Sequence, residues 1–254
     1  MSEPLSLSIA DGVAHLELTR PERSNAFDLT AARAFAEAVQ IIERDDAARA
    51  VLLTGAGKRF CAGGDIHSMI AADDSSAYLR ELADVLDGAL QKLDSLPKPV
   101  VVAVQGSVAG AGIGVMLAGD LIVADHATRF VTAYSGIGLT PDCGVSWLLP
   151  RAVGQQRALQ LLLTPTVIDG DQALSWGLVT EVVSGNAVSR ARELAASIAT
   201  GPSHALGQAR RLQRGSWSAD RATTGADESR TIAAAITTPE ATALVASFAG
   251  SSRP

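Results

Sequence analysis

The order of apolar and polar positions predicts that the chain opens with a β-hairpin. Residues 5–9 and 13–18 alternate apolar with other side chains on either side of Asp11-Gly12, a pattern typical of two strands joined by a tight turn. Residues 30–44 then carry apolar side chains at helical spacing, and residues 50–54 are almost continuously apolar. The first part of the chain is therefore predicted to run strand, strand, helix, strand.

The same alternation continues to about residue 124. Residues 73–96 have a helical period that ends at Pro97 and Pro99, and residues 100–104 form a second apolar strand. A glycine-rich turn at 106–114 leads into a short apolar helix, and residues 121–124 predict a further strand. Alternating strands and helices favour parallel pairing, with binding loops at the carboxyl ends of the strands.

Helices dominate the prediction from about Val145 onward. Helical segments are predicted at 145–153, 155–163, 171–176, 187–199, 203–214, 219–237 and 240–248. We expect an α/β core over residues 1–200 and a helical region over residues 201–254, with Gly201-Pro202 as the hinge. The helical region is expected to pack on the core or on a neighbouring subunit.

Composition narrows the class of protein. The 254 residues are 47% apolar and 19% charged, which is typical of a globular domain, and the net charge of −6 argues against nucleic acid as the main partner. No apolar run approaches the roughly 20 residues of a membrane span, and the N-terminus lacks a basic segment followed by an apolar one. The two cysteines are far apart in sequence, which favours a reducing cytoplasm over a disulfide framework or a metal site.

An anionic ligand would need a local basic patch in so acidic a chain. Arg20, Arg23, Lys58 and Arg59 could form one, since they lie in two loops that follow predicted strands. Composition alone favours scattered surface charge.

Two glycine-rich loops carry the candidate chemistry. Gly55-Ala-Gly-Lys-Arg-Phe-Cys-Ala-Gly-Gly-Asp65 and Gln105-Gly-Ser-Val-Ala-Gly-Ala-Gly-Ile-Gly114 each follow a strand, so both could direct backbone N–H groups at one carbonyl oxygen. The glycine spacing does not fit a dinucleotide fingerprint, and no glycine precedes Lys-Ser or Lys-Thr as in a P-loop. Tight packing without any ligand is the structural alternative for either loop.

Taken in order, the motifs resemble those of the crotonase, or enoyl-CoA hydratase/isomerase, superfamily over nearly the whole chain. They are Arg20-Pro-Glu-Arg-Ser-Asn-Ala26, Arg59-Phe-Cys-Ala-Gly-Gly-Asp65, Ala103-Val-Gln-Gly-Ser-Val-Ala-Gly-Ala-Gly112, Gly119-Asp-Leu-Ile-Val-Ala124, Gly138-Leu-Thr-Pro-Asp-Cys-Gly144 with Leu149-Pro-Arg-Ala-Val-Gly154, and Ala173-Leu-Ser-Trp-Gly-Leu-Val179. The resemblance implies an α/β crotonase-like (ClpP/crotonase) spiral of β-β-α units, a trimer or dimer of trimers, and an acyl-coenzyme A substrate with no metal or redox cofactor.

The resemblance also implies roles for single residues. The N–H groups of Gly64 and Ala111 would stabilise the enolate oxygen of a thioester, a contribution of about a hundred- to a thousandfold in rate per donor. The residues implied in coenzyme A binding are Arg23, Ala26, Lys58, Ala62, Asp65 and Ile66. The acyl pocket would include His67, Gly114 and Tyr134, although a lone histidine at a helix start is more often a surface residue.

The chain departs from the hydratase pattern at two positions. Related hydratases use two glutamates to hold and activate water, and alignment of the flanking motifs puts Gly114 and Tyr134 there. One carboxylate remains, Asp142, at the position of the catalytic aspartate in the epoxyphenylacetyl-CoA isomerase and chlorobenzoyl-CoA dehalogenase branches. Asp142 could instead be a turn or helix-capping residue, and the adjacent Cys143 is interpreted as a packing residue.

These features favour an enoyl-CoA isomerase, acting on a double bond or on a ring-bearing acyl group, with Asp142 as the base. Two alternatives stay open at this point. One is an enoyl-CoA hydratase, a lyase of fatty-acid or aromatic-acid degradation, that recruits another group. The other is a non-catalytic acyl-CoA-binding protein, in which Gly114 and Tyr134 mark lost activity.

Overall fold

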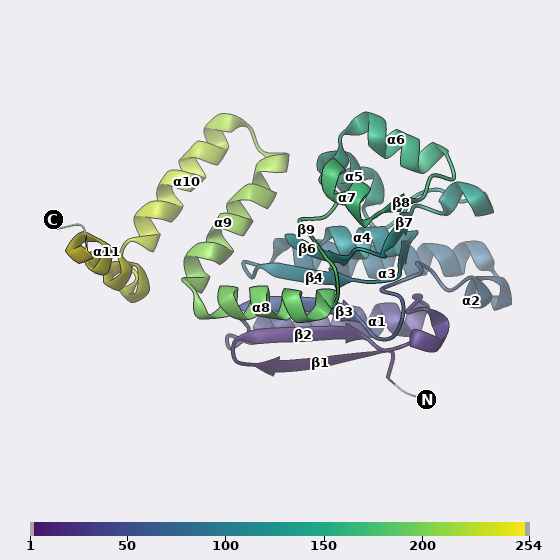
Figure 1. Ribbon diagram of the computed structural model, residues 1–254, viewed down its shortest axis with the longest axis horizontal. Helices are drawn as coiled ribbons and strands as arrows, with labels where there is room; N and C mark the ends of the chain where they lie inside the picture. Colours follow the sequence, from purple (N-terminus) through teal and green to yellow (C-terminus); the bar gives the residue numbers. More distant parts are fainter. Residues whose placement is uncertain (1–2, 252–254) are drawn as a thin grey trace.

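The computed structural model describes residues 3–251 and is built around a six-stranded sheet (Figure 1). Hairpin strands β1 (Leu5–Ala10) and β2 (Val13–Leu18) pair antiparallel, and the turn residues Asp11 and Gly12 both have positive φ. The sheet continues in parallel through β3 (Ala50–Gly55), β4 (Val100–Val104), β6 (Leu121–Asp125) and β9 (Glu181–Val183). The predicted hairpin and the parallel pairing that follows it are confirmed.

A smaller sheet was not expected from the sequence. It contains β5 (Ser107–Ala109), β7 (Arg129–Val131) and β8 (Ile168–Asp169), in the order β5-β7-β8. Strands of two or three residues are too short to show a period of two, and β5 lies inside the segment predicted as a glycine-rich turn. The small sheet matters for function because β5 leads directly into the candidate site.

Helices cover both faces of the large sheet (Figure 1). Successive residues of a strand point to opposite faces, so Val51 and Leu53 pack with α1 (Leu29–Arg44) and α3 (Ser75–Ser95), in the larger core. Leu52 belongs instead to a second core against α8 (Ala187–Thr200). This helix buries an alanine at every fourth position, at residues 187, 191, 195 and 199. Small side chains on one stripe let α8 lie close to the sheet.

Apart from α2, for which the sequence predicted no separate helix, the remaining helices follow the predicted order. They are α2 (Ile66–Ala71), α4 (Ala111–Leu117), α5 (Val145–Val153), α6 (Gln155–Leu163), α7 (Gly170–Trp176), α9 (Ser203–Gly215), α10 (Arg221–Ala235) and α11 (Pro239–Ser251). Two predicted helices start later than expected because aspartates cap them: Asp74 accepts from the amide of Ala77, and Asp220 accepts from Thr223. Periodicity locates a helix but not its cap.

Buried ion pairs fasten α9 to the core. Arg210 is 4% exposed in its side chain, and its Nε lies 2.6 Å from Asp120 Oδ2; Arg214 Nη2 lies 3.0 Å from Asp120 Oδ1. Asp120 also accepts from the amide of Val100, at the start of β4. One carboxylate thus links a central strand to the first helix of the C-terminal region.

Helices α10 and α11 extend away from the sheet, at the left of Figure 1. No side chain of α10 is buried. Within residues 3–251 no single helix combines the length and apolar character needed to cross a bilayer; α10 and α11 meet those criteria only as a pair bent by 81°.

Replacing Asp120 with alanine should lower the free energy of unfolding by about 3 kcal/mol, because the buried Arg210 would keep only its longer ion pair to Asp94, at 3.9 Å. Urea denaturation at neutral pH measures the change. The control is Glu81→Ala, which removes an exposed ion pair to Arg33 and should cost less than about 1 kcal/mol. Equal losses in the two variants would show that the buried pairs do not fasten α9.

Candidate functional site

The loop after β3 lies directly against the first turn of α4. Isolated parallel bridges join Cys61 to Val108 and Phe27 to Gly64, which places the loop beside β5. A Cβ on Gly63, where φ is +93°, would lie 2.9 Å from the carbonyl oxygen of Ala109 and 3.2 Å from the nitrogen of Ala111. A Cβ on Gly112 would lie 2.6 Å from the carbonyl oxygen of Cys61. The two backbones can approach this closely only because neither glycine has a side chain.

This approach leaves two amides facing one cavity. Within residues 3–251, the N–H groups of Gly64 and Ala111 donate to no protein acceptor. Both residues line a cavity of about 390 Å³, which we call the oxyanion cavity. Ala111 is the first residue of α4, where an amide has no partner within the helix. Two unpaired amides that face one cavity can stabilise a negatively charged oxygen.

Tyr134 and Asp142 line the same cavity. Tyr134 is 7% exposed, and its hydroxyl donates to Asp142 Oδ1 over 2.7 Å. Backbone in the left-handed region precedes the tyrosine and follows the aspartate, with φ of +62° at Ala133 and +48° at Cys143. Such conformations are costly for residues other than glycine, and they cluster at functional sites. Here they turn the chain so that the two side chains meet.

The local environment raises the pKa values of Tyr134 and Asp142. Burial raises the pKa of Asp142 above its ordinary value, while hydrogen bonds from Tyr134 and from the Cys143 thiol lower it in part. Burial, with the nearby Asp142 charge, raises the pKa of Tyr134. The same two causes raise the pKa of Cys143, so its thiol stays protonated at neutral pH. Asp142 is therefore a candidate proton acceptor for the cavity, and the protonated thiol of Cys143 is buried beside it.

Apolar side chains form most of the other walls of the oxyanion cavity. They come from α2, α3 and the segment before Asp142: Ile66, Met69, Leu79, Ile137 and Leu139. The terminal methyl of Met69 occupies the space beside Gly64, 2.3 Å from where a Cβ on that glycine would be. The cavity thus combines an apolar wall with two amides and one carboxylate.

Two residues predicted for the acyl pocket lie outside this lining. His67 is exposed, because residues 66 and 69 occupy the face of α2 that points into the cavity and residue 67 does not share that face. Gly114 is buried against the neighbouring loop: a Cβ there would lie 2.3 Å from the carbonyl oxygen of Cys143. The position aligned with a hydratase glutamate is therefore filled by the backbone next to Asp142. Of the three predicted residues, only Tyr134 lines the cavity.

The residues predicted to bind coenzyme A lie in different settings. Ala62 and Ile66 are exposed and line the oxyanion cavity. Ala26 is buried, and its carbonyl accepts from the Arg20 guanidinium. Asp65 is 4% exposed; its carboxylate caps α2 through the amides of His67 and Ser68, so only a small part of it can meet a ligand. Arg23 and Lys58 are exposed.

Of the four basic residues that could form a patch in the sequence, Arg20 is already paired with carboxylates of the protein. Arg20 lies 2.7 Å from Asp28 and 3.4 Å from Asp65, and its side chain is 15% exposed, so it holds the loops together. Arg23, Lys58 and Arg59 remain exposed, and Arg59 donates to the Ser24 hydroxyl. Three cations are therefore left on the outer surface of the two loops.

Comparison with known proteins assigns the family. The family model for enoyl-CoA hydratase/isomerase matches residues 8–244. The chain is 39% identical to 1,2-epoxyphenylacetyl-CoA isomerase of Escherichia coli, over 82% of this chain and 80% of that protein. It is 35% identical to 4-chlorobenzoyl coenzyme A dehalogenase-2 of an Arthrobacter species, over 84% and 78%. The crystal structure of an enoyl-CoA hydratase of Mycobacterium smegmatis superposes with a TM-score of 0.92 at 30% identity, covering 100% of this chain and 98% of that one.

Replacing Tyr134 with phenylalanine should raise the pKa of Asp142 further, because the hydroxyl that donates to the carboxylate is lost while burial is kept. Carbon-13 NMR of labelled aspartate carboxyls, assigned with Asp142→Asn, follows the titration. The chain has one other tyrosine, Tyr78, whose hydroxyl contacts the amide of Leu29, so Tyr78→Phe is the matched control. An Asp142 midpoint that is the same in both variants would contradict the hydrogen bond.

Proposed function

Since the chain belongs to the enoyl-CoA hydratase/isomerase family, we propose that it binds an acyl-coenzyme A thioester and isomerises the acyl group by moving one proton. The observation that carries the proposal is the convergence of the Gly64 and Ala111 amides with the Asp142 carboxylate on one cavity. Such a proton transfer needs hydrogen-bond donors for the thioester oxygen and a base for the proton.

The reaction is proposed to proceed in two proton transfers. The Asp142 carboxylate takes a proton from the α or γ carbon of the acyl group, and the electron pair of that C–H bond moves through the conjugated system onto the thioester oxygen. The amides of Gly64 and Ala111 donate to this enolate oxygen. The protonated Asp142 then returns the proton to the other carbon. The oxidation state does not change, so the proposed reaction uses no redox cofactor.

Tyr134 is proposed as a positioning residue for Asp142. Its hydroxyl donates to Oδ1 and so fixes the orientation of the carboxylate. Burial makes the carboxylate a stronger base, and the hydrogen bond limits how far its pKa rises. Both effects are needed, because a base acts only while it is deprotonated and is most effective with a pKa near the working pH.

A hydratase is the second candidate, and the similarity to a hydratase structure favours it. Against it, Gly114 has no carboxylate and packs on the carbonyl of Cys143, while the Tyr134 hydroxyl is already bonded to Asp142. A hydratase would add water to crotonyl-CoA, and that activity would survive Asp142→Ala. A non-catalytic acyl-CoA-binding protein would bind the thioester without turnover.

The C-terminal helices are proposed to mediate assembly into a trimer or a dimer of trimers. Helices α10 and α11 carry exposed apolar side chains at Ile232, Ile236, Leu244, Val245 and Phe248. Exposed apolar patches are typical of protein–protein interfaces. Residues 201–254 would then serve mainly for assembly, and residues 1–200 for catalysis.

Sedimentation equilibrium of the full chain tests the assembly. We expect the mass of three or six chains for the wild type, and a smaller species for the double substitution of Leu244 and Val245 with aspartate, which would place charges in the interface. Substituting the exposed Ser229 with aspartate adds charge outside the apolar set and should leave the mass unchanged. A wild type that sediments as one chain would rule out the proposal.

Asp142→Asn should lower the rate of proton exchange into an enoyl-CoA by about 10²- to 10⁴-fold, the range for general acid–base catalysis. The measurement is deuterium incorporation from heavy water into a panel of enoyl-CoAs, followed by mass spectrometry. The asparagine keeps the shape of the side chain and removes only its basicity. Equal deuterium incorporation with both proteins would eliminate Asp142 as the base.

A further inference from the structure

A second and larger cavity adjoins the oxyanion cavity at Asp142. It has a volume of about 660 Å³ and lies between α3 and the start of α5, so we call it the α3–α5 cavity. The two cavities share the residues Ala83, Pro141 and Asp142. Asp142 therefore stands at the boundary between two spaces, and only one of them contains the amides that would hold the thioester.

The direction of the acyl group follows from these fixed points. In the proposed function, the thioester oxygen lies at the amides of Gly64 and Ala111, and the carbons that exchange a proton lie beside Asp142, all on one cavity. An acyl group that continues in line beyond the reacting carbons passes Asp142. The α3–α5 cavity opens at that residue.

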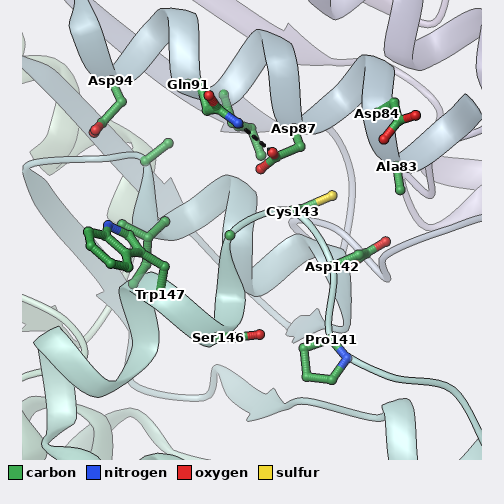
Figure 2. A pocket seen from close by; sticks show the side chains of 14 residues that line it. Ala83, Asp84, Asp87, Gln91, Asp94, Pro141, Asp142, Cys143, Ser146 and Trp147 are labelled. Atoms are coloured by element: carbon green, nitrogen blue, oxygen red, sulfur yellow. Dashed lines mark hydrogen bonds between the residues drawn. The ribbon is translucent and has the colours of Figure 1, made fainter. Parts of the chain in front are cut away.

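The lining of the α3–α5 cavity is acidic and polar on its α3 side. Figure 2 shows Asp84, Asp87, Gln91 and Asp94 along α3, across the cavity from the loop that carries Asp142. Ser146 and Trp147 line it from α5, and no lysine or arginine is among its lining residues. The cavity therefore has hydrogen-bonding groups for a substrate but no cation for a carboxylate.

The three α3 carboxylates differ in their partners. Asp84 is 73% exposed and lies near the Arg80 guanidinium, while Asp94 lies 2.8 Å from Arg214. Asp87 accepts a hydrogen bond from Gln91 over 2.6 Å and has no ion pair within residues 3–251 (Figure 2). Among these three, its charge is therefore the one that an acyl group in the cavity would meet without a neutralising partner.

We propose that the α3–α5 cavity is the distal acyl subsite. It selects acyl groups that are long enough to pass Asp142 and that end in an apolar or hydroxyl-bearing group rather than a carboxylate. Ala83 and Asp87 set this selection. Ala83 controls the passage because it is the α3 residue that lines both cavities. Asp87 excludes anionic ends by repulsion and can accept a hydrogen bond from a hydroxyl. The inference rests on the proposed function, since it takes the thioester to lie at the amides.

Substituting Ala83 with leucine tests the passage. We expect the ratio of kcat/KM for decenoyl-CoA to that for hexenoyl-CoA to fall at least tenfold, because each methylene kept out of the cavity forfeits about fourfold in binding. The matched control is Ala77→Leu, the same change at an exposed position of α3 that lines neither cavity. A chain-length ratio unchanged in Ala83→Leu would overturn the proposal.

Asp87→Asn tests the charge selection with acyl-CoAs of equal length that end in methyl, hydroxymethyl or carboxylate. The wild type should disfavour the carboxylate at least tenfold against the methyl compound, and the asparagine variant should reduce that discrimination at least fivefold. Asp84→Asn, at the exposed carboxylate, should leave it within twofold. Equal discrimination in wild type and Asp87→Asn would contradict the role of Asp87.

Equilibrium binding separates failure of the subsite from failure of the proposed reaction. Calorimetric titration with saturated acyl-CoAs of four to twelve carbons needs no turnover. Suppose that no enoyl-CoA exchanges deuterium, but that the affinity rises with chain length in the wild type and does not rise in Ala83→Leu. The proposed reaction is then wrong, and the proposed subsite is supported. If exchange depends on Asp142 but neither affinity nor rate depends on Ala83, the reaction stands and the subsite is wrong.

Discussion

The contact between the loop at residues 61–65 and the first turn of α4 is the constraint on which the rest of the site depends. The backbone atoms there are so close that a Cβ on Gly63 or Gly112 would overlap a carbonyl oxygen of the other segment. The Cys61 side chain is fully buried beneath this contact, and burial raises its pKa to about 12, so it packs as a neutral group. With the loop and helix locked together, the amides of Gly64 and Ala111 have no freedom to rotate away and bond to the protein. Their pairing partner must then be a ligand or water.

The second element of the site is a balance of opposing effects on one carboxylate. Burial favours the protonated form of Asp142, and the Tyr134 hydroxyl favours the charged form. The balance is maintained by backbone that is itself strained, at Ala133 and Cys143. Packing of the core around β7 and α5 must supply the stability that holds these conformations. Stability in the scaffold and reactivity in the cavity are therefore coupled through the segment from 130 to 145.

The sequence predicted more of the fold than of the site. The hairpin, the parallel strands and the limits of α5 and α6 follow from periodicity, whereas β5, β7, β8 and β9 have too few residues to show one. The two amides were predicted from motif resemblance, because main-chain donors depend on loop shape and not on side-chain identity. The bond from Tyr134 to Asp142 left no sequence signal, since it depends on two left-handed residues that are not glycine. His67, Gly114 and Arg20 show the same limit, because helix face, loop packing and ion pairing are settled only in three dimensions.

The packing of Gly114 on the carbonyl of Cys143 also bears on how such enzymes can diverge. A side chain at position 114 of α4 and the present loop beside Asp142 compete for the same volume, so this loop conformation requires glycine there. A single substitution at position 114 would displace the segment that carries Asp142, because the new side chain would meet the carbonyl oxygen of Cys143. Placing a carboxylate at that position therefore requires the loop to be rebuilt together with the helix.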